Sequence, residues 1–242
     1  NVDDLEWTYL QGDGDFRSDE VKKFRNEADI IVTNPPFSLF KEFLTWLVEA
    51  KKDFVVIGNM NAITYKEAFS LIKDDKMWLG ATNFNLGMFF FVPDNFVYAK
   101  TYKFDREKDG KKVSRVPGVC WYTTLEHGRR HQPLALMSEA DNLKFSKHAG
   151  IKDLGYQRYD NYDAIEVPKV EAIPRDYAGT MGVPVTFLSK YNPDQFEILG
   201  ASDNGAVPEE LKLPHFKKHN EPFINGTKLY KRIFIRHKKA SK

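Results

Sequence analysis

The chain contains one cysteine, Cys120, among its 242 residues. A lone cysteine cannot form an internal disulfide. Together with six scattered histidines it does not provide the ligand pattern of a zinc site, so we expect no bound metal. We expect Cys120 to be a small buried hydrophobe. A low cysteine content is typical of the reducing cytoplasm, which is the location that the sequence predicts.

Long apolar runs are also absent. Residues 88–92 are apolar but only long enough for a strand, whereas a membrane-spanning helix needs about 20 apolar residues. We therefore expect no membrane contact. Charge of one sign is not in excess either, because 36 basic residues face 34 acidic ones and the net charge is +2. The hydrophobic fraction of 42% is that of a globular protein.

Basic residues nevertheless gather near the C-terminus, where residues 228–242 include no acid. The basic residues of this C-terminal strip are Lys228, Lys231, Arg232, Arg236, Lys238, Lys239 and Lys242. Such a strip can neutralise nucleic-acid phosphates by releasing counterions, and our candidate DNA contacts are Lys231, Arg232 and Arg236. A solubilising tail explains the same residues equally well.

Residues 30–37 are the most informative stretch. The β-branched run Ile-Ile-Val-Thr predicts a buried parallel strand. Pro35 and Pro36 end this strand, because neither can donate a backbone hydrogen bond. Asn34 precedes a proline and is pushed toward an extended conformation. The sequence therefore predicts a rigid turn at the carboxyl end of a strand, which is where open α/β sheets bind ligands.

The chemistry of this turn suits a planar amine. The side-chain oxygen of Asn34 and the carbonyl of Pro35 are acceptors for the two hydrogens of an exocyclic amino group. Drawing both protons to acceptors leaves the nitrogen lone pair available for attack. Phe37 offers a flat face on which a heterocycle can stack. The structural alternative is the start of a helix, with proline at its first position and Phe37 in the core.

An Asp-Phe pair, Asp15-Phe16, lies upstream of this turn in the segment Gly-Asp-Gly-Asp-Phe. Taken alone, the segment favours an ordinary Asp-Gly turn. Its place before the Asn-Pro-Pro-Phe strand gives it a second interpretation as a cofactor-binding element.

Longer phrases extend the pattern along the chain. They are Gly-Asp-Gly-Asp-Phe-Arg-Ser-Asp-Glu from Gly12, Asn-Pro-Pro-Phe-Ser-Leu-Phe from Asn34, Ile-Gly-Asn-Met-Asn-Ala-Ile-Thr-Tyr-Lys-Glu from Ile57, Tyr-Asp-Asn-Tyr-Asp-Ala-Ile-Glu-Val from Tyr159, Met-Gly-Val-Pro-Val-Thr-Phe-Leu from Met181 and Tyr-Asn-Pro-Asp-Gln-Phe-Glu-Ile-Leu-Gly from Tyr191. On these phrases the chain resembles the EcoRI-type adenine-specific DNA methyltransferases. Many amino-methyltransferases share the Asn-Pro-Pro-Phe element, whereas the phrases after Tyr159 are more specific to this family.

The resemblance implies a function and a set of site residues. It implies S-adenosylmethionine as cofactor, double-stranded DNA as substrate and N6 of adenine as the methylated atom. The implied catalytic residues are Asn34, Pro35, Pro36 and Phe37. Asp15 would accept the amino group of the cofactor adenine, and Phe16 would pack on its ring. Trp121 or Tyr122 would cover the second face of the target base. A cognate restriction enzyme, encoded elsewhere, is a further expected partner.

One family element has no counterpart here. Such enzymes carry an earlier strand and loop that hold the methionine and ribose parts of the cofactor. Residues 1–11 are too few for this, because one βαβ unit takes roughly thirty residues. We therefore expect a C-terminal fragment of a longer enzyme. A non-catalytic DNA-binding remnant is one alternative, and an amino-methyltransferase acting on RNA or on protein glutamine is another.

The order of apolar patterns predicts an α/β fold. We expect strands over residues 28–33, 53–59, 77–79, 88–92 and 119–125, and helices over residues 38–51 and 64–73. This order indicates the C-terminal half of a doubly wound, Rossmann-like methyltransferase sheet that ends in antiparallel strands. The charged residues 103–115, with Asp109-Gly110, predict a mobile hairpin or insertion.

The character of the sequence changes near residue 130. Residues 1–130 are expected to form the partial methyltransferase catalytic domain. Residues 131–242 are expected to form an irregular α+β lobe for recognition of the DNA target. Within this lobe, residues 164–170 alternate like a strand, and Asn225-Gly226 predicts a hairpin.

Overall fold

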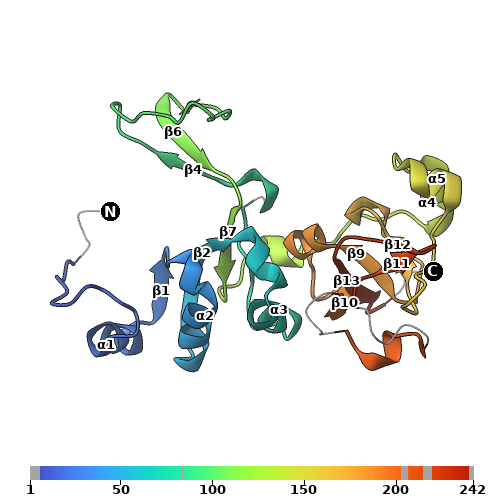
Figure 1. Cartoon of the computed structure of the whole chain (residues 1–242), viewed down its shortest axis with the longest axis horizontal. Coiled ribbons are helices and arrows are strands. Elements are labelled where there is room, and N and C mark those ends of the chain that lie inside the picture. The colour runs from blue at the N-terminus through green and yellow to red at the C-terminus, as the bar shows by residue number, and fades with distance from the viewer. Residues whose placement is uncertain (1–5, 83, 203–206, 215–219, 240–242) are drawn as a thin grey trace.

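The computed structural model describes residues 6–82, 84–202, 207–214 and 220–239. It is a mixed α/β structure with several sheets. Figure 1 shows three parts, which are a sheet with helices in the N-terminal half, an arm that projects from it, and a C-terminal lobe. Lys242 of the C-terminal strip lies outside the described residues.

The first sheet has the strand order β1-β2-β7-β3. Its strands are β1 (Ile30–Thr33), β2 (Asp53–Asn59), β3 (Trp78–Leu79) and β7 (Val119–Thr123). β1 and β2 are parallel, whereas β7 is antiparallel to both β2 and β3. The four strands expected here are thus confirmed, although all but β2 are shorter than predicted.

Two amphipathic helices, α2 (Phe40–Glu49) and α3 (Lys66–Lys73), pack against one face of this sheet. The Phe40 ring lies 5.2 Å from the Tyr122 ring in β7. Gly58 makes this approach possible, because a Cβ there would lie 2.5 Å from the Phe40 ring. Both helices begin later than predicted, since the 3-10 turns η2 (Phe37–Leu39) and η3 (Met60–Thr64) precede them.

The expectation that β1 is a buried strand is wrong. Ile30 is 48% exposed and Val32 is 69% exposed, while Ile31, on the other face, packs against the core. β1 lies at the edge of the sheet. The helices pack against the Ile31 face, and Ile30 and Val32 on the opposite face remain largely exposed. The apolar run therefore reports a strand correctly but not its burial.

A helix that the sequence did not predict, α1 (Asp19–Glu27), precedes β1. The Ser18 hydroxyl caps it by accepting a hydrogen bond from the Val21 N–H at 3.2 Å. Acidic residues in its first turn suit the positive end of the helix dipole. None of its residues is buried, so its apolar pattern was too weak to reveal it.

The arm comprises residues 88–116 and has a small sheet of its own with the order β4-β6-β5. Its strands are β4 (Met88–Phe91), β5 (Glu107–Lys108) and β6 (Lys111–Val116). Asp109 and Gly110 join β5 to β6 with φ values of 52° and 71°, as expected for a tight hairpin. Figure 1 shows the arm extending away from both other parts of the molecule.

The C-terminal lobe contains a second four-stranded sheet with the order β10-β13-β9-β8. Its strands are β8 (Ile165–Glu166), β9 (Met181–Pro184), β10 (Phe196–Ala201) and β13 (Arg232–His237). The helices and 3-10 turns of the remaining chain are η4 (Phe84–Leu86), η5 (Gly128–His131), α4 (Glu139–Phe145), α5 (Ala149–Leu154), η6 (Val170–Ala172), η7 (Val185–Lys190) and η8 (Glu209–Leu211).

Two expectations for this lobe have different outcomes. The Asn225-Gly226 hairpin is confirmed, because it joins β11 (Phe223–Ile224) to the antiparallel β12 (Thr227–Lys228). The strand over residues 164–170 is mostly wrong, since only β8 forms there. Pro168 follows it and cannot donate to a strand ladder, and η6 comes next.

The main hydrophobic core includes residues from both halves of the chain. Phe69 and Ile72 of α3 belong to the same buried cluster as Phe187 and Leu188 of η7. Cys120 is buried and free, as expected, and burial raises the pKa of its thiol to about 12. In the described part of the chain, no helix is long and apolar enough to cross a bilayer, and no cluster of metal-ligating side chains occurs.

Candidate active site

The Asn34 turn leaves the first sheet at the carboxyl end of β1. Thr33, the last residue of β1, pairs with Val56 of the parallel strand β2, which continues to Asn59. Asn34 therefore lies at the end of the sheet where both parallel strands finish. The Asn34 side chain is exposed, and among the described residues no group donates a hydrogen bond to its oxygen. This acceptor is available to a ligand.

The three residues after Asn34 differ in exposure. Pro35 is buried, whereas Pro36 is exposed and has φ −63° and ψ 122°. The Leu39 N–H donates to the Pro36 carbonyl at 3.0 Å, and this bond closes η2. Phe37 begins η2 with 39% of its surface exposed. A polar acceptor and an open aromatic ring are thus three residues apart on one rigid turn, and the structural alternative of a core Phe37 is wrong.

The carboxyl end of β2 lies next to that of β1, at the end of the sheet that we call the Asn34 edge. The Asn59 side-chain oxygen accepts a hydrogen bond from the Asn61 N–H at 2.8 Å, which starts η3. The Asn59 carbonyl accepts from the Tyr122 hydroxyl at 2.8 Å. The Met60 N–H donates to the Gly118 carbonyl at 2.8 Å. These bonds fix the carboxyl end of β2 to the start of β7, and no motif in the sequence predicts them.

A cavity of about 430 Å³ lies beside this edge, between η3 and the C-terminal lobe. Its lining includes Asn61 and Tyr65 from the first part and Thr186, Tyr230 and Lys231 from the lobe. The Lys231 ammonium lies 3.5 Å from the Thr64 hydroxyl. The tertiary structure thus brings one of the predicted DNA contacts, Lys231, next to the edge that carries Asn34.

The Asp15-Phe16 pair is arranged differently from the expectation. Phe16 is only 7% exposed, and its ring meets those of Phe43 and Trp46 edge-on at 5.2 Å and 5.6 Å. It is a core residue and offers little ring surface to a ligand. Asp15 stays partly exposed, but its carboxylate pairs with the Arg17 guanidinium at 2.6 Å. The hydrogen bonds from Arg17 lower the pKa of Asp15 to about 2, so its carboxylate is ionised.

Neither of the two aromatic residues proposed for the second face of the base has an open ring beside Asn34. Tyr122 is fully buried, and burial holds the pKa of its hydroxyl well above the usual value. Trp121 points to the other face of the sheet, where it packs against Ile57, Met88 and Val119 at the base of the arm. Tyr122 is thus excluded as a base-stacking residue, because alternation along β7 turns it into the core.

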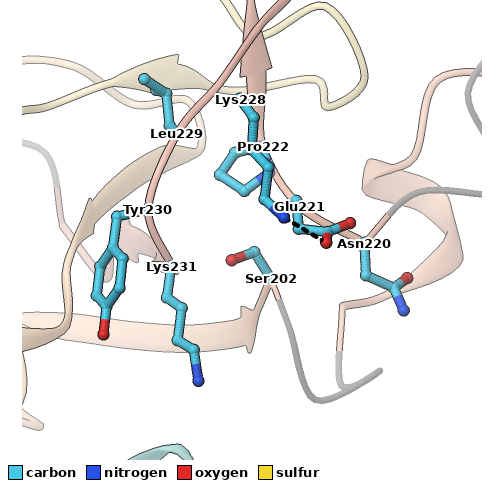
Figure 2. A pocket seen from close by; sticks show the side chains of 8 residues that line it. All are labelled: Ser202, Asn220, Glu221, Pro222, Lys228, Leu229, Tyr230 and Lys231. Carbon is cyan, nitrogen blue, oxygen red and sulfur yellow. Dashed lines mark hydrogen bonds and ion pairs between the residues drawn. The ribbon is translucent and has the colours of Figure 1, made fainter.

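The C-terminal strip is not a chain of free cations. Lys228 pairs with Glu221 at 2.8 Å, Arg232 with Glu166 at 2.7 Å and Arg236 with Glu197 at 2.9 Å. The Lys228–Glu221 pair, shown in Figure 2, lines a cavity of about 380 Å³ together with Lys231. Arg232 is mostly buried and cannot reach a phosphate in this position.

The alternative of a solubilising tail is also wrong for the described part of the strip. Residues 232–237 form β13, which pairs with β10 on one side and β9 on the other. Ile233, Phe234 and Ile235 of this strand are buried. Glu166 and Glu197 come from segments 66 and 39 residues away, so the local sequence could not reveal these two pairs.

Comparison with known proteins gives a consistent result. Residues 1–238 match the family described as adenine-specific methyltransferase EcoRI. The type II methyltransferase M.EcoRI of Escherichia coli is 40% identical over 241 residues, which are 99% of this chain and 67% of that protein. M.MgeORF184P of Mycoplasma genitalium is 39% identical over 95% of this chain and 71% of its own length. M.MpnI of Mycoplasma pneumoniae is 38% identical over 94% and 70%. No solved structure matches the chain.

Proposed function

The chain belongs to the EcoRI family of adenine-specific methyltransferases, and we propose that it transfers a methyl group from S-adenosylmethionine to N6 of adenine in double-stranded DNA. The observation that supports this most directly is the turn after β1. There an exposed, unoccupied acceptor on Asn34 stands three residues from the half-exposed ring of Phe37, at the carboxyl end of two parallel strands.

The target adenine must leave the duplex to reach this turn, at a cost of a few kcal/mol. The Asn34 side-chain oxygen and the Pro35 carbonyl then accept the two hydrogens of N6. The Phe37 ring stacks on the base and fixes its plane. The N6 lone pair forms the new N–C bond while the donor C–S bond breaks and sulfur keeps that electron pair, and N6 afterwards loses one proton to solvent. Catalysis rests on positioning, so no strong base is needed.

S-adenosylmethionine would supply an electrophilic sulfonium methyl group. Asp15 fits the adenine amino group of this cofactor as a hydrogen-bond acceptor, because its carboxylate is ionised and partly exposed. Arg17 occupies that carboxylate and would have to move aside. Phe16 does not fit as an open stacking surface. Its place is behind the Asp15 loop, where its contacts with Phe43 and Trp46 hold the loop on α2.

The topology supports a finer assignment of the fold and domains. We infer that the order β1-β2-β7-β3, with β7 antiparallel, is the C-terminal half of a doubly wound methyltransferase sheet. Residues 1–130 would then be the catalytic part and residues 131–242 a lobe for target recognition. The cavity between η3 and the lobe is consistent with a substrate that touches both.

The test is Asn34→Ala in the complete gene product. We expect methyl transfer to adenine in duplex DNA to fall by about a hundredfold or more, because one transition-state hydrogen bond is lost. The free energy of unfolding should be unchanged, since the Asn34 side chain is exposed. Asn26→Ala, in the exposed helix α1, is the control and should keep full activity. Wild-type transfer rates in the Asn34 variant would refute the assigned role. Methylation of RNA or of a protein by the wild type, with none of DNA, would refute the substrate.

A further inference from the structure

We propose that the arm, residues 88–116, is a basic clamp that binds the phosphate backbone of the DNA duplex beside the methylated base. This inference rests on the proposed function and adds to it a second contact surface, which is separate from the Asn34 turn and from the C-terminal strip. Four observations support it. They concern the position of the arm, its net charge, the lack of ion pairs at two of its lysines among the described residues, and its stiffness.

The arm starts at the edge of the sheet that carries Asn34. β6 passes through Gly118 into β7, whose first residue, Val119, pairs with Asn59 at the carboxyl end of β2. The Gly118 carbonyl accepts a hydrogen bond from Met60, so the root of the arm is fixed to this edge. Figure 1 shows the arm rising from the same side of the sheet at which β1 ends. A duplex docked on the Asn34 edge would therefore run beside the arm.

The arm has an excess of positive charge within a nearly neutral chain. It contains seven basic residues and four acidic ones, an excess of three positive charges, whereas the whole chain has a net charge of +2. Positive charge on a projecting element is complementary to the phosphate backbone, and it raises the rate at which DNA is encountered.

Two lysines of the β5–β6 hairpin have no carboxylate partner among the described residues. Lys108 and Lys111 are exposed and directly opposite each other in the β5–β6 hairpin. In the described part of the chain neither forms an ion pair. Their ammonium groups lie over aromatic rings instead, 5.4 Å from the Phe89 ring centre and 5.2 Å from that of Phe91. A ring orders the lysine side chain but leaves its charge unneutralised, so the cation remains available to a phosphate.

A ladder of aromatic rings stiffens the arm. The rings of Tyr98 and Tyr102 lie 4.7 Å apart, and that of Phe104 lies 5.5 Å from Tyr102. The Tyr98 hydroxyl donates to the Val113 carbonyl at 2.7 Å, and the Tyr102 hydroxyl accepts from the Arg115 N–H at 2.7 Å. A preorganised arm pays less ordering entropy when it binds. These contacts tie the hairpin that the sequence predicted within residues 103–115 to the rest of the arm.

The contrast with the C-terminal strip locates the phosphate contacts. Lys228, Arg232 and Arg236 each face a carboxylate of the same chain, so a phosphate would have to displace that carboxylate. Lys108 and Lys111 have no such competitor in the part of the chain that the structure describes. When lysines neutralise phosphates, the counterions condensed on the DNA are released, and this release makes DNA binding depend on salt.

The experiment is a titration of duplex DNA at several salt concentrations without cofactor. The double variant Lys108→Gln/Lys111→Gln removes these two lysine cations from the arm. We expect the log–log salt slope to fall by about 0.9 for each lost contact, and affinity to drop alike for all sequences. The control Arg158→Gln/Lys190→Gln removes two exposed cations that are ion-paired with Asp163 and Glu171. It changes the net charge equally and should leave the slope unchanged.

Two results would overturn the inference. One is an unchanged slope in the arm variant, and the other is an equal loss of slope in the control, which would indicate a general effect of net charge. Sedimentation tests whether the arm binds a second copy of this chain, because self-association that the arm variant abolishes would make the arm a dimer contact instead.

The clamp and the proposed function can be refuted separately. Binding that depends on the arm without methyl transfer would refute only the function, and methyl transfer with an arm-independent slope would refute only the clamp.

Discussion

Arg232 and Glu166 form an ion pair in which Nη2 and Oε1 are 2.7 Å apart and only 12% and 11% of the two side chains are exposed. The Arg232 Nε also donates to Glu166 Oε2 at 3.0 Å, and the Tyr159 hydroxyl donates to the same carboxylate. Burial holds the pKa of Tyr159 well above its usual value. This network ties β13 to β8, so Arg232 has a structural role.

Arg232→Ala should therefore destabilise the protein. Removing one partner leaves the buried Glu166 carboxylate uncompensated, which costs about 3–5 kcal/mol. Arg236→Ala is the matched comparison, because its pair with Glu197 is half-exposed on both sides and is worth about 0–1 kcal/mol. Chemical denaturation of both variants measures the difference. Equal stability of the two would show that the Arg232 pair is not effectively buried.

Gly58→Ala should also destabilise the fold, through crowding at the carboxyl end of β2. The new Cβ would lie 2.5 Å from the Phe40 ring and 2.8 Å from that of Tyr122. Both rings are buried and cannot move freely, so we expect a loss of about 1–3 kcal/mol in the free energy of unfolding. Gly128→Ala is the control, because no atom lies within 4 Å of its Cβ position. A neutral Gly58 variant would mean that α2 can shift on the sheet.

Phe37→Ala tests the stacking surface without disturbing the core. The ring is 39% exposed, and base–aromatic stacking is worth about 1–3 kcal/mol. We expect the rate of adenine methylation at low DNA concentration to fall by roughly 5- to 150-fold. Phe37→Trp keeps a flat face and should retain most of the activity. Equal activity of the alanine and tryptophan variants would contradict a stacking role.

His131 should make stability depend on pH. Hydrogen bonds with Asp194 at 2.7 Å and with Glu126 at 3.1 Å raise the pKa of the imidazole above its ordinary value. A group with a raised folded-state pKa contributes its full stabilisation below the unfolded value near 6.5. That stabilisation is lost as the pH rises through the folded-state pKa.

The pH prediction is checked by denaturation between pH 6 and about pH 8.5. The wild type should lose stability across this interval by more than His131→Gln, which cannot titrate. Asp194 has a lowered pKa because of the same contact, so its share is lost only at acidic pH. Parallel pH profiles for the wild type and the glutamine variant would rule out a stabilising imidazolium.

Local chemistry determined those parts of the protein that depend on neighbours along the chain. The Pro35-Pro36 pair ends β1 wherever that strand packs, because neither residue can donate a hydrogen bond. The Asn225-Gly226 turn forms because both residues accept positive φ, here 50° and 73°. The phrases around Asn34, Tyr159 and Tyr191 also identified the family, without any contact being known.

Tertiary structure alone decided burial, pairing and direction. The β1 run is as apolar as a buried strand, yet Val32 is exposed because the helices pack against the opposite face. The C-terminal strip contains no acid, yet Glu166 and Glu197 reach it from segments that are distant in the sequence. Phe16 lies in an aromatic cluster with α2, and Tyr122 lies under Phe40. These outcomes depend on which surfaces meet when the chain folds, and periodicity along the sequence records the faces of an element but not what covers them.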